Sequence, residues 1–375
     1  TYAVTRMDAN AGGVTIAGDA SGTFATVNAN ASAVRLTTSG NVTMTAVDTE
    51  IVASSGTGDY ALGTVDSSTS ALVQITTSTG DDSVTLTSDA TGGADKYIVT
   101  MGDGADAVVA TATAAASVIN LGDGADTFTP TAAGYNGTMD GGDGSDTVVL
   151  AAGDYSADGV WTNIEVINIA GATTVSEAQL DNDSTFQITG ANNVITATGV
   201  TSTDLSNVTY QAGNTSSFDI TGHATADSTL TGSDGVDTLT GVGGDDTLSS
   251  GLGADTLEGA AGADTLTGGE GTDTFNGGTG ADSLILTETT AVADNILLTA
   301  SATNGVDTIT GFAAGGGADT VTLVAADSLV GTGTGNAVVG TATAALVAGA
   351  AVWDGTNTNF DVGTHDVGEI ATTLS

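Results

Sequence analysis

The feature that most limits the possible folds of this chain is a nine-residue repeat that fills residues 232–285. Its six contiguous copies read GSDGVDTLT, GVGGDDTLS, SGLGADTLE, GAAGADTLT, GGEGTDTFN and GGTGADSLI. The fourth position is always glycine: Gly235, Gly244, Gly253, Gly262, Gly271 and Gly280. The sixth is always aspartate: Asp237, Asp246, Asp255, Asp264, Asp273 and Asp282. The eighth is always large and apolar: Leu239, Leu248, Leu257, Leu266, Phe275 and Leu284. Three fixed positions over six copies indicate that every copy builds the same structural unit.

The repeat predicts an all-β fold made of stacked coils. Side chains alternate between the two faces of a strand, so the eighth-position residue points to one face and its neighbours to the other. A short strand and a glycine-rich turn make half a coil, so two nonapeptides make a coil of 18 residues. One coil buries too little apolar surface by itself, and neighbouring coils must stack. We therefore expect a parallel β-roll, or β-solenoid, with the eighth-position residues in its core.

Stacking places the aspartates of every second copy above one another. One edge would carry Asp237, Asp255 and Asp273, and the other would carry the sixth-position aspartates of the even copies. Stacked strands lie about 4.8 Å apart, and two carboxylates at that separation repel by roughly 3 kcal/mol at an effective dielectric constant of about 20. Glycines allow a positive φ, which lets the turns aim backbone carbonyls at one point. Carboxylate and carbonyl oxygens from adjacent turns favour Ca²⁺ over Mg²⁺, so we expect Ca²⁺ between coils, held at the fourth-position glycines and sixth-position aspartates.

The charge balance and composition exclude several classes of function. The chain has 3 Lys and Arg residues against 45 Asp and Glu residues, for a net charge of −42. Binding to nucleic acid or to anionic membranes requires basic groups, so we expect neither partner. So large a net charge pushes a compact fold apart unless salt or bound cations offset it. The absence of cysteine excludes disulfides and thiol catalysis. No apolar run reaches the ~20 residues of a membrane span, so we expect no membrane insertion.

A looser version of the turn recurs upstream. The segments GDGADAVV, GDGADTF and GDGSDTVV place Asp106, Asp126 and Asp146 at intervals of 20 residues, and TGDDSVTL places Asp82 earlier. This spacing predicts a solenoid with longer coils over residues 79–150. The sequence leaves two readings open for these aspartates, as metal ligands or as solvated acids of ordinary turns.

The rest of the chain predicts further β structure. Alternating segments rich in Val, Ile and Thr predict strands over residues 33–40, 41–47, 71–78, 163–171, 184–190 and 216–222. One short helix is expected over residues 175–180, with Ser176 as its cap. We expect these modules to be β-solenoid-like or β-sandwiches. The expected segments are an N-terminal β module, a degenerate solenoid, a connecting module, the nonapeptide roll and a C-terminal capping region, at residues 1–78, 79–150, 151–231, 232–285 and 286–375.

The nonapeptide resembles the Gly-Gly-x-Gly-x-Asp-x-apolar-x repeat of RTX proteins, which fold as a parallel β-roll on Ca²⁺. The departures are small: Ser250 replaces the first glycine of the third copy, and the second position is often Ser, Val or Ala. The resemblance implies multiple Ca²⁺ ions as cofactors.

The segment GVDTITGFAAGGGADTVTL, at residues 305–323, resembles the sequence that commonly follows RTX blocks. This implies family-like metal positions for Asp307 and Asp319, with Phe312 as a cap, although both aspartates could equally be ordinary turn acids. The tail from about residue 345 is similar to the C-terminal export signals of type I secretion.

No catalytic constellation or cofactor loop emerges, so we do not expect an enzyme. His223 and His365 stand in no motif, and GTGTG at residues 331–335 lacks the strand and helix of a dinucleotide site. The composition, together with GVWTNIEVINIAGATTVSEAQL at residues 159–180, resembles RTX-type surface-layer (S-layer) proteins. That resemblance implies a self-assembling subunit on the surface of a Gram-negative bacterium, with copies of itself and an outer-membrane glycan as partners. The alternatives are a secreted adhesin or matrix protein that binds glycan or ice, and the C-terminal part of a larger exported enzyme.

Overall fold

The computed structural model describes residues 2–323 and 359–361, with gaps at loops. Within 2–323 the gaps are residues 5–6, 9–13, 19–20, 25–26, 29–32, 45, 49–50, 67–71, 88–95, 112–116, 132–134, 136, 181–185, 287, 291, 299–306 and 312–318. The chain forms two compact units. Unit 1 contains residues 1–193 and 210–214, and unit 2 contains residues 194–209 and 215–375. The five segments expected from the sequence are a finer division, which remains a proposal.

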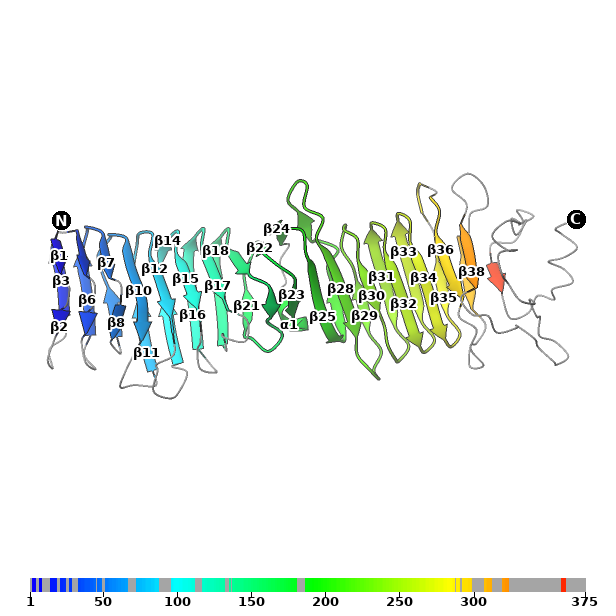
Figure 1. Cartoon of the computed structure of the whole chain (residues 1–375), viewed down its shortest axis with the longest axis horizontal. Helices are drawn as coiled ribbons and strands as arrows, with labels where there is room; N and C mark the ends of the chain where they lie inside the picture. The colour runs from blue at the N-terminus through cyan, green and yellow to red at the C-terminus, as the bar shows by residue number, and fades with distance from the viewer. Residues whose placement is uncertain are drawn as a thin grey trace, which may run out of the picture. The chain divides into compact units, whose positions relative to one another are not determined.

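Unit 1 is a stack of parallel strands arranged in two long sheets (Figure 1). The first sheet contains, in spatial order, β1 (Tyr2–Val4), β4 (Gly22–Phe24), β7 (Val42–Met44), β10 (Tyr60–Asp66), β12 (Ser83–Leu86), β15 (Ala107–Ala110), β17 (Thr127–Pro130), β19 (Thr147–Leu150), β22 (Val166–Ile169), β24 (Gln187–Gly190) and β27 (Thr209–Tyr210). Three short strands belong to the same sheet: β2 (Met7–Asp8) pairs with β5 (Val27–Asn28), β5 pairs with β8 (Ala46–Asp48), and β8 pairs with β10. Pairing continues from β10 to β12, so the stack runs unbroken past residue 78.

The second sheet of unit 1 supplies the other half of each coil. Its order is β21 (Val160–Thr162), β18 (Gly137–Gly144), β16 (Ser117–Gly124), β13 (Lys96–Thr100), β11 (Leu72–Thr76), β9 (Ile51–Ser54), β6 (Ala33–Thr38) and β3 (Val14–Gly18), with β14 (Asp103–Gly104) beside β16. Unit 1 also contains the parallel strands β20 (Gly153–Asp154) and β23 (Thr173–Val175), which pair with each other.

Unit 2 repeats the same design over the nonapeptides. One sheet contains β25 (Val194–Val200), β28 (Ser217–Gly222), β30 (Thr238–Thr240), β32 (Thr256–Ala261), β34 (Thr274–Thr279), β36 (Asn295–Leu298) and β38 (Thr320–Leu323). The other contains β26 (Ser202–Asp204), β29 (Thr229–Thr231), β31 (Thr247–Leu252), β33 (Thr265–Glu270), β35 (Ser283–Ile285), β37 (Thr308–Thr310) and β39 (Asn359–Asp361). Among the described strands, β39 alone pairs antiparallel, with β37.

The register confirms that two nonapeptides make one coil. Leu239 pairs with Leu257, and Leu248 with Leu266, so each strand lies beside the strand two copies later. All six eighth-position residues are buried. The parallel β-solenoid expected from the sequence is therefore confirmed. Apart from β39, the described strands outside the repeat also pair in parallel and stack as coils. The β-sandwich alternative is therefore wrong for the part of the chain that the structure describes.

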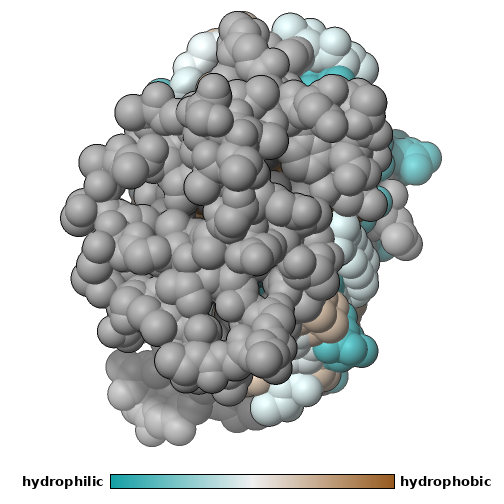
Figure 2. Space-filling view, turned by 90° about the vertical axis from the view of Figure 1, so that its right-hand side faces the viewer, coloured by the Kyte–Doolittle hydropathy of each residue, from teal (hydrophilic) through white to brown (hydrophobic). Residues whose placement is uncertain are grey.

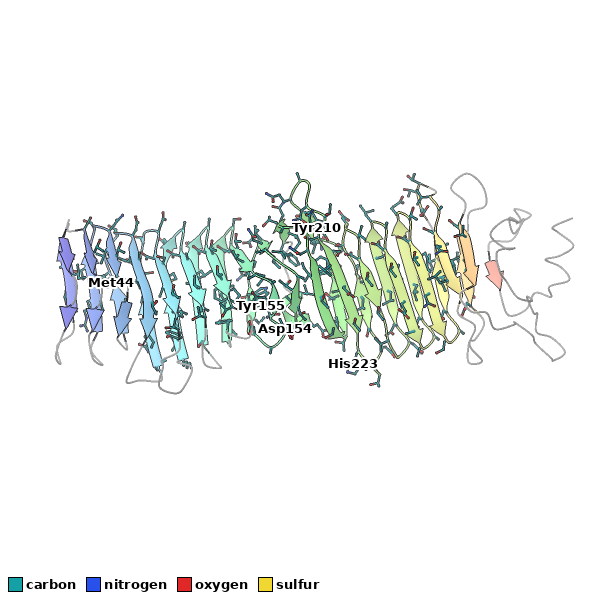
Figure 3. The ribbon with its side chains drawn as sticks, viewed as in Figure 1. Met44, Asp154, Tyr155, Tyr210 and His223 are labelled. Atoms are coloured by element: carbon teal, nitrogen blue, oxygen red, sulfur yellow. The ribbon has the colours of Figure 1, made fainter. Side chains whose placement is uncertain are left out.

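Apolar side chains that alternate along the strands fill the interior of each unit. In unit 1, β12 and β15 each alternate half-exposed and buried residues. Met44 of β7, labelled in Figure 3, is one of the largest fully buried side chains. The core also holds Tyr60, Tyr97, Phe128 and Trp161, so unit 1 packs more aromatic residues than the nonapeptide block, whose only eighth-position aromatic residue is Phe275.

The expected helix is shorter than the sequence predicts. Helix α1 covers Glu177–Leu180, because Val175 belongs to β23 and is buried. Ser176 does stand at its start: the backbone N–H of Gln179 donates to the Ser176 carbonyl at 3.1 Å. The Ser176 N–H in turn donates to the Gln179 side chain at 2.8 Å, which is one half of a capping box. None of the described helices is long and apolar enough to cross a membrane.

Candidate metal-binding turns

The sixth-position aspartates form two continuous ladders along the edges of the roll. On one edge, the Asp237 N–H donates to Asp255 Oδ1 at 2.7 Å, and the Asp255 N–H donates to Asp273 Oδ1 at 2.9 Å. On the other, the Asp246 N–H donates to Asp264 Oδ1 at 2.7 Å. Oδ1 of each carboxylate therefore accepts the backbone N–H of the aspartate in the coil before it. This is the stacking of alternate copies that the repeat predicts.

The second oxygen of these carboxylates, Oδ2, is buried, and in most copies it accepts no hydrogen bond. All six side chains are only 1–2% exposed. No donor reaches the buried Oδ2 atoms of Asp264, Asp273 and Asp282 among the described residues. Asp237 differs, because the backbone N–H and the hydroxyl of Ser233 donate to its Oδ2 at 2.7 and 2.8 Å. An unpaired buried carboxylate oxygen is costly, so these atoms point to a missing cation.

In the five copies that begin with glycine, this residue leaves open the space beside Oδ2. A Cβ on Gly259 would lie 2.3 Å from Asp264 Oδ2 and 2.6 Å from the carbonyl oxygen of Gly277. A Cβ on Gly241 would lie 2.2 Å from Asp246 Oδ2 and 2.9 Å from the carbonyl oxygen of Gly259. A carboxylate oxygen and a carbonyl oxygen of the next coil thus line a hollow that a Cβ on either glycine would fill.

The fourth glycine brings a second carbonyl to the same interface. Gly262 has a φ of 149°, and a Cβ there would lie 1.7 Å from the carbonyl oxygen of Gly244 and 3.1 Å from Asp264 Oδ1. Gly253, Gly271 and Gly280 also have positive φ, whereas Gly235 of the first copy does not. The fourth glycine is therefore required by the close approach of the coil before it.

One coil interface thus offers oxygens of four residues: Asp246 Oδ2, Asp264 Oδ1 and the carbonyls of Gly244 and Gly259. An all-oxygen set of carboxylates and carbonyls suits Ca²⁺. No group of three His, Asp or Glu side chains gathers at one point within the described ranges. The carbonyls are therefore an essential part of any metal site here.

The second position of the nonapeptide adopts a positive φ in five copies, although two of these copies have Val or Ala there. Val242 and Ala260 adopt φ values of 83° and 72°. This left-handed region disfavours residues with a Cβ, and β-branched residues most. Gly251 adopts the same conformation without strain, with φ of 103°.

Burial raises the pKa of all six sixth-position aspartates. It raises the pKa of Asp255 to about 7, with the Asp237 and Asp273 carboxylates adding to the effect. It raises the pKa of Asp264 to about 6, and the Asp282 carboxylate adds to the effect. The pKa values of the other four sixth-position aspartates are also raised, mainly by burial. Without a metal, the carboxyls of the folded ladder therefore bind protons more tightly than free carboxyls do, and a bound cation would displace these protons.

The upstream aspartates form a ladder of the same kind in unit 1. The N–H groups of Asp82, Asp106 and Asp126 donate to Oδ1 of the next aspartate at 2.7, 2.7 and 2.9 Å, and the ladder ends at Asp146. All four side chains are buried. The reading as solvated acids is therefore wrong.

The upstream turns differ from the nonapeptides at the first position. In the order of the ladder, that place holds Thr77, Met101, Leu121 and Gly141. The first three are buried and carry a Cβ at the place where the nonapeptides have glycine. The upstream turns are therefore not equivalent to one another as metal sites.

The ladders of unit 2 extend beyond the nonapeptides. The Asp282 N–H donates to Asp307 Oδ1 at 3.0 Å, and the Asp294 N–H donates to Asp319 Oδ1 at 3.0 Å. Asp307 and Asp319 are 5% and 8% exposed. The structure thus brings both residues into the ladders, whereas Phe312 and the tail from residue 345 lie outside the described residues.

Sequence reasoning missed Asp294, which accepts the Asp273 N–H at 2.8 Å and is 1% exposed. It stands 21 residues after Asp273, so it falls outside the 18-residue beat. The available signal was the buried Ile296 two residues later, which repeats the relation between the sixth and eighth positions. Burial raises the pKa of Asp294 to about 7, with Glu288 and Asp273 adding to the effect.

His223 has a structural role in the turn between β28 and β29, at the lower edge of unit 2 in Figure 3. Its Nδ1 accepts the backbone N–H groups of Thr225 and Ala226 at 3.3 and 3.0 Å. His365 lies outside the described residues.

Comparison with known proteins agrees with this geometry. Residues 225–257 and 249–284 match the family model of the RTX calcium-binding nonapeptide repeat. Comparisons with curated proteins and with solved structures give no match. RTX nonapeptides bind Ca²⁺ between coils, and the buried aspartates are consistent with this. The nonapeptide block of unit 2 is therefore a calcium-binding RTX β-roll.

Proposed function

We propose that this chain is a secreted, calcium-dependent structural protein and a self-assembling S-layer subunit of a Gram-negative bacterium. RTX repeats are typical of secreted proteins. The observation that carries the proposal is the pair of buried carboxylate ladders in unit 2 and the similar ladder in unit 1. Only 3 basic residues stand against 45 acids, so the protein's own cations cannot neutralise these ladders.

Calcium also explains how such a chain could be exported, for which we propose type I secretion. At low calcium the ladder carboxylates repel one another and oppose folding. Outside the cell, metal binding supplies free energy of folding, because the unfolded chain has no preformed site. The chain would then pass the membrane unfolded and fold on the far side.

Exposed acids along one edge of unit 1 support an assembly role. The few described atoms that Figure 2 shows around its grey atoms are teal, near white and in places brown. Exposed acids such as Asp123 and Asp143 stack in register along the edge of unit 1. Calcium shared between such acids on neighbouring copies would link them, and an outer-membrane glycan would anchor the lattice.

The test is electron microscopy of the purified protein, first with calcium and then with a chelator. We expect ordered two-dimensional arrays with calcium that dissolve on chelation. Dispersed, single particles under both conditions would contradict the S-layer proposal while leaving calcium-dependent folding intact.

An adhesin or matrix protein is the second candidate. It is favoured by the threonines of the strand faces: Thr238 pairs with Thr256, and Thr256 with Thr274. Such rows of hydroxyl groups could bind a glycan or ice. Scattered material on cells, together with binding of the monomer to a glycan array, would favour this candidate over a lattice subunit.

A further inference from the structure

The outer face of the second sheet of unit 1 is unusually apolar for so acidic a chain. Among the described residues of unit 1, Leu72 and Val118 are the large apolar side chains that lie exposed, at 38% and 45%, and both belong to this sheet. Its strands β11, β13, β16, β18 and β21 lie side by side (Figure 1). Exposed apolar side chains that gather on one face are typical of a contact surface.

The register gathers apolar side chains of this face into one row across the strands. Its members, each paired with the next, are Gln74, Ile98, Val118, Thr138 and Val160. All five are exposed or half-exposed. Successive strands lie about 4.8 Å apart, so the three aliphatic residues form a stripe that Thr138 alone interrupts. We call these five residues the central row.

The same face carries basic residues, which are rare in this chain. Lys96 begins β13 and pairs with Leu72, and Arg35 points outward from β6. They are two of the three basic residues of the sequence. The opposite ends of the strands carry an exposed row of acids in register: Asp103, Asp123 and Asp143. The face therefore has a cation at one edge, a row of acids at the other, and the central row between them.

A second copy of the same face supplies the complementary charges. The strands of the sheet are parallel, so their starts lie along one edge and their ends along the other. When two copies stack face to face with their strands antiparallel, Lys96 of each approaches the acid row of the other. With the strands parallel, acids would face acids, which costs several kcal/mol. The charges therefore favour one arrangement, in which a two-fold axis runs along the stack of coils.

This arrangement lays the central row of one copy over that of the other, because residues near a two-fold axis face their own counterparts. The eight strands from β3 to β21, with a spacing of about 4.8 Å and a length of about 16 Å, present about 600 Å² per copy. A pair would bury about 1,200 Å² in total, which is the lower limit of specific interfaces. One such contact is weak, and this suits a lattice in which each subunit makes several contacts.

We propose that the outer face of the second sheet of unit 1 is a two-fold contact between copies of this chain. Ile98, Val118 and Val160 form its centre, and Lys96 lies against the partner's Asp123 and the acids in register with it. The contact rests on the proposed lattice function, for which it names one interface. It differs from a calcium link between exposed acids, because apolar side chains hold its centre and calcium acts only through the folding of the chain.

The absence of cysteine makes this contact accessible to cross-linking. Val118→Cys introduces a single thiol on the central row, and Val149→Cys introduces one on the half-exposed side of β19, in the other sheet. Stacked sheets lie about 10 Å apart, which is too far for a disulfide but within reach of a short bis-maleimide. We expect the Val118→Cys protein, folded in calcium, to give a cross-linked dimer on a denaturing gel, and the Val149→Cys protein to stay a monomer.

Val118→Asp tests the strength of the contact, with Val149→Asp as the matched control that adds the same charge to the other sheet. Sedimentation velocity over a range of protein concentrations in calcium measures the Kd of the dimer. We expect Val118→Asp to raise this Kd about tenfold or more, because like charges opposed across an interface cost at least the ~1.4 kcal/mol of a tenfold change. Val149→Asp should leave it unchanged. Circular dichroism checks that each variant is folded, and Lys96→Glu replaces Val118→Asp if it is not.

Three results would overturn the contact: a protein that stays monomeric at concentrations that give arrays, equal cross-linking of the two cysteine variants, or equal Kd values for the two aspartate variants. Arrays that still form in electron microscopy would then leave the lattice proposal standing. Conversely, a dimer that depends on Val118 but never gives arrays would support the contact and contradict the S-layer role.

Discussion

Replacing Asp264 by asparagine should change the stability of unit 2 in opposite directions with and without calcium. The side chain is 1% exposed, Oδ1 accepts the Asp246 N–H, and Oδ2 has no hydrogen-bond partner. Asparagine has the same shape and keeps an oxygen for the Asp246 N–H. Its amide group would lie where Oδ2 lies, on the side of the Gly277 carbonyl. The substitution therefore removes a charge and adds a donor.

The size of the effect in chelator follows from the pKa of the buried carboxyl. Burial raises the pKa of Asp264 from 3.8 to about 6. A shift of about 2 units corresponds to about 3 kcal/mol at a pH where the group is ionised. Solvent and neighbouring dipoles screen part of this charge, so we expect Asp264→Asn to stabilise the metal-free protein by about 1–2 kcal/mol.

The effect with calcium has the opposite sign. A ligand at 100 times its Kd stabilises the folded state by about 2.7 kcal/mol, and this contribution is lost if the site no longer binds. Urea unfolding followed by circular dichroism, in chelator and in calcium, measures both effects. Asp219→Asn is the matched control, because it removes the same charge from the strand face of β28. If Asp264→Asn destabilised the protein equally under both conditions, the unpaired charge would not be the reason for calcium dependence.

Three other outcomes follow from the same structure. Val242→Gly should stabilise the fold by about 1 kcal/mol, because it relieves the strain of a valine at a left-handed φ of 83°, at some cost in backbone entropy. Val242→Ala keeps a Cβ, so its gain in stability should be much smaller in the same unfolding assay. Leu266→Ala should cost about 2–5 kcal/mol, because Leu266 is fully buried in the roll, and a smaller loss would show that the coils close around the gap. The free energy of unfolding in chelator should fall as pH rises from about 4 to about 7. Burial raises the pKa of Asp106 and Asp255 from 3.8 to about 7. Over this pH range the folded state therefore holds more protons than the unfolded state, and a rise in pH removes them. A pH titration of the unfolding midpoint checks this, and a midpoint that rose over that range without calcium would contradict it.

The sequence by itself determined the properties that follow from the spacing of its nine-residue repeat. The nine-residue beat specified the 18-residue coil, the buried eighth position and the stacking of alternate aspartates, because each follows from strand alternation and the length of a half-coil. It also indicated Ca²⁺, because stacked acids with three basic residues in the whole chain require external cations.

Only the tertiary structure decided which atoms face one another across a coil interface. It showed that Oδ1 serves the backbone of the neighbouring coil while Oδ2 faces the first-position glycine, a contact between residues that no spacing rule identifies. It placed Asp294 in the ladder despite the inserted residues that break the beat. It also distinguished Gly141 from Met101 and Leu121, which stand at the same place, five residues before a buried aspartate. The stacked coils bring a carboxylate oxygen next to Gly141, and this contact cannot be read from the spacing.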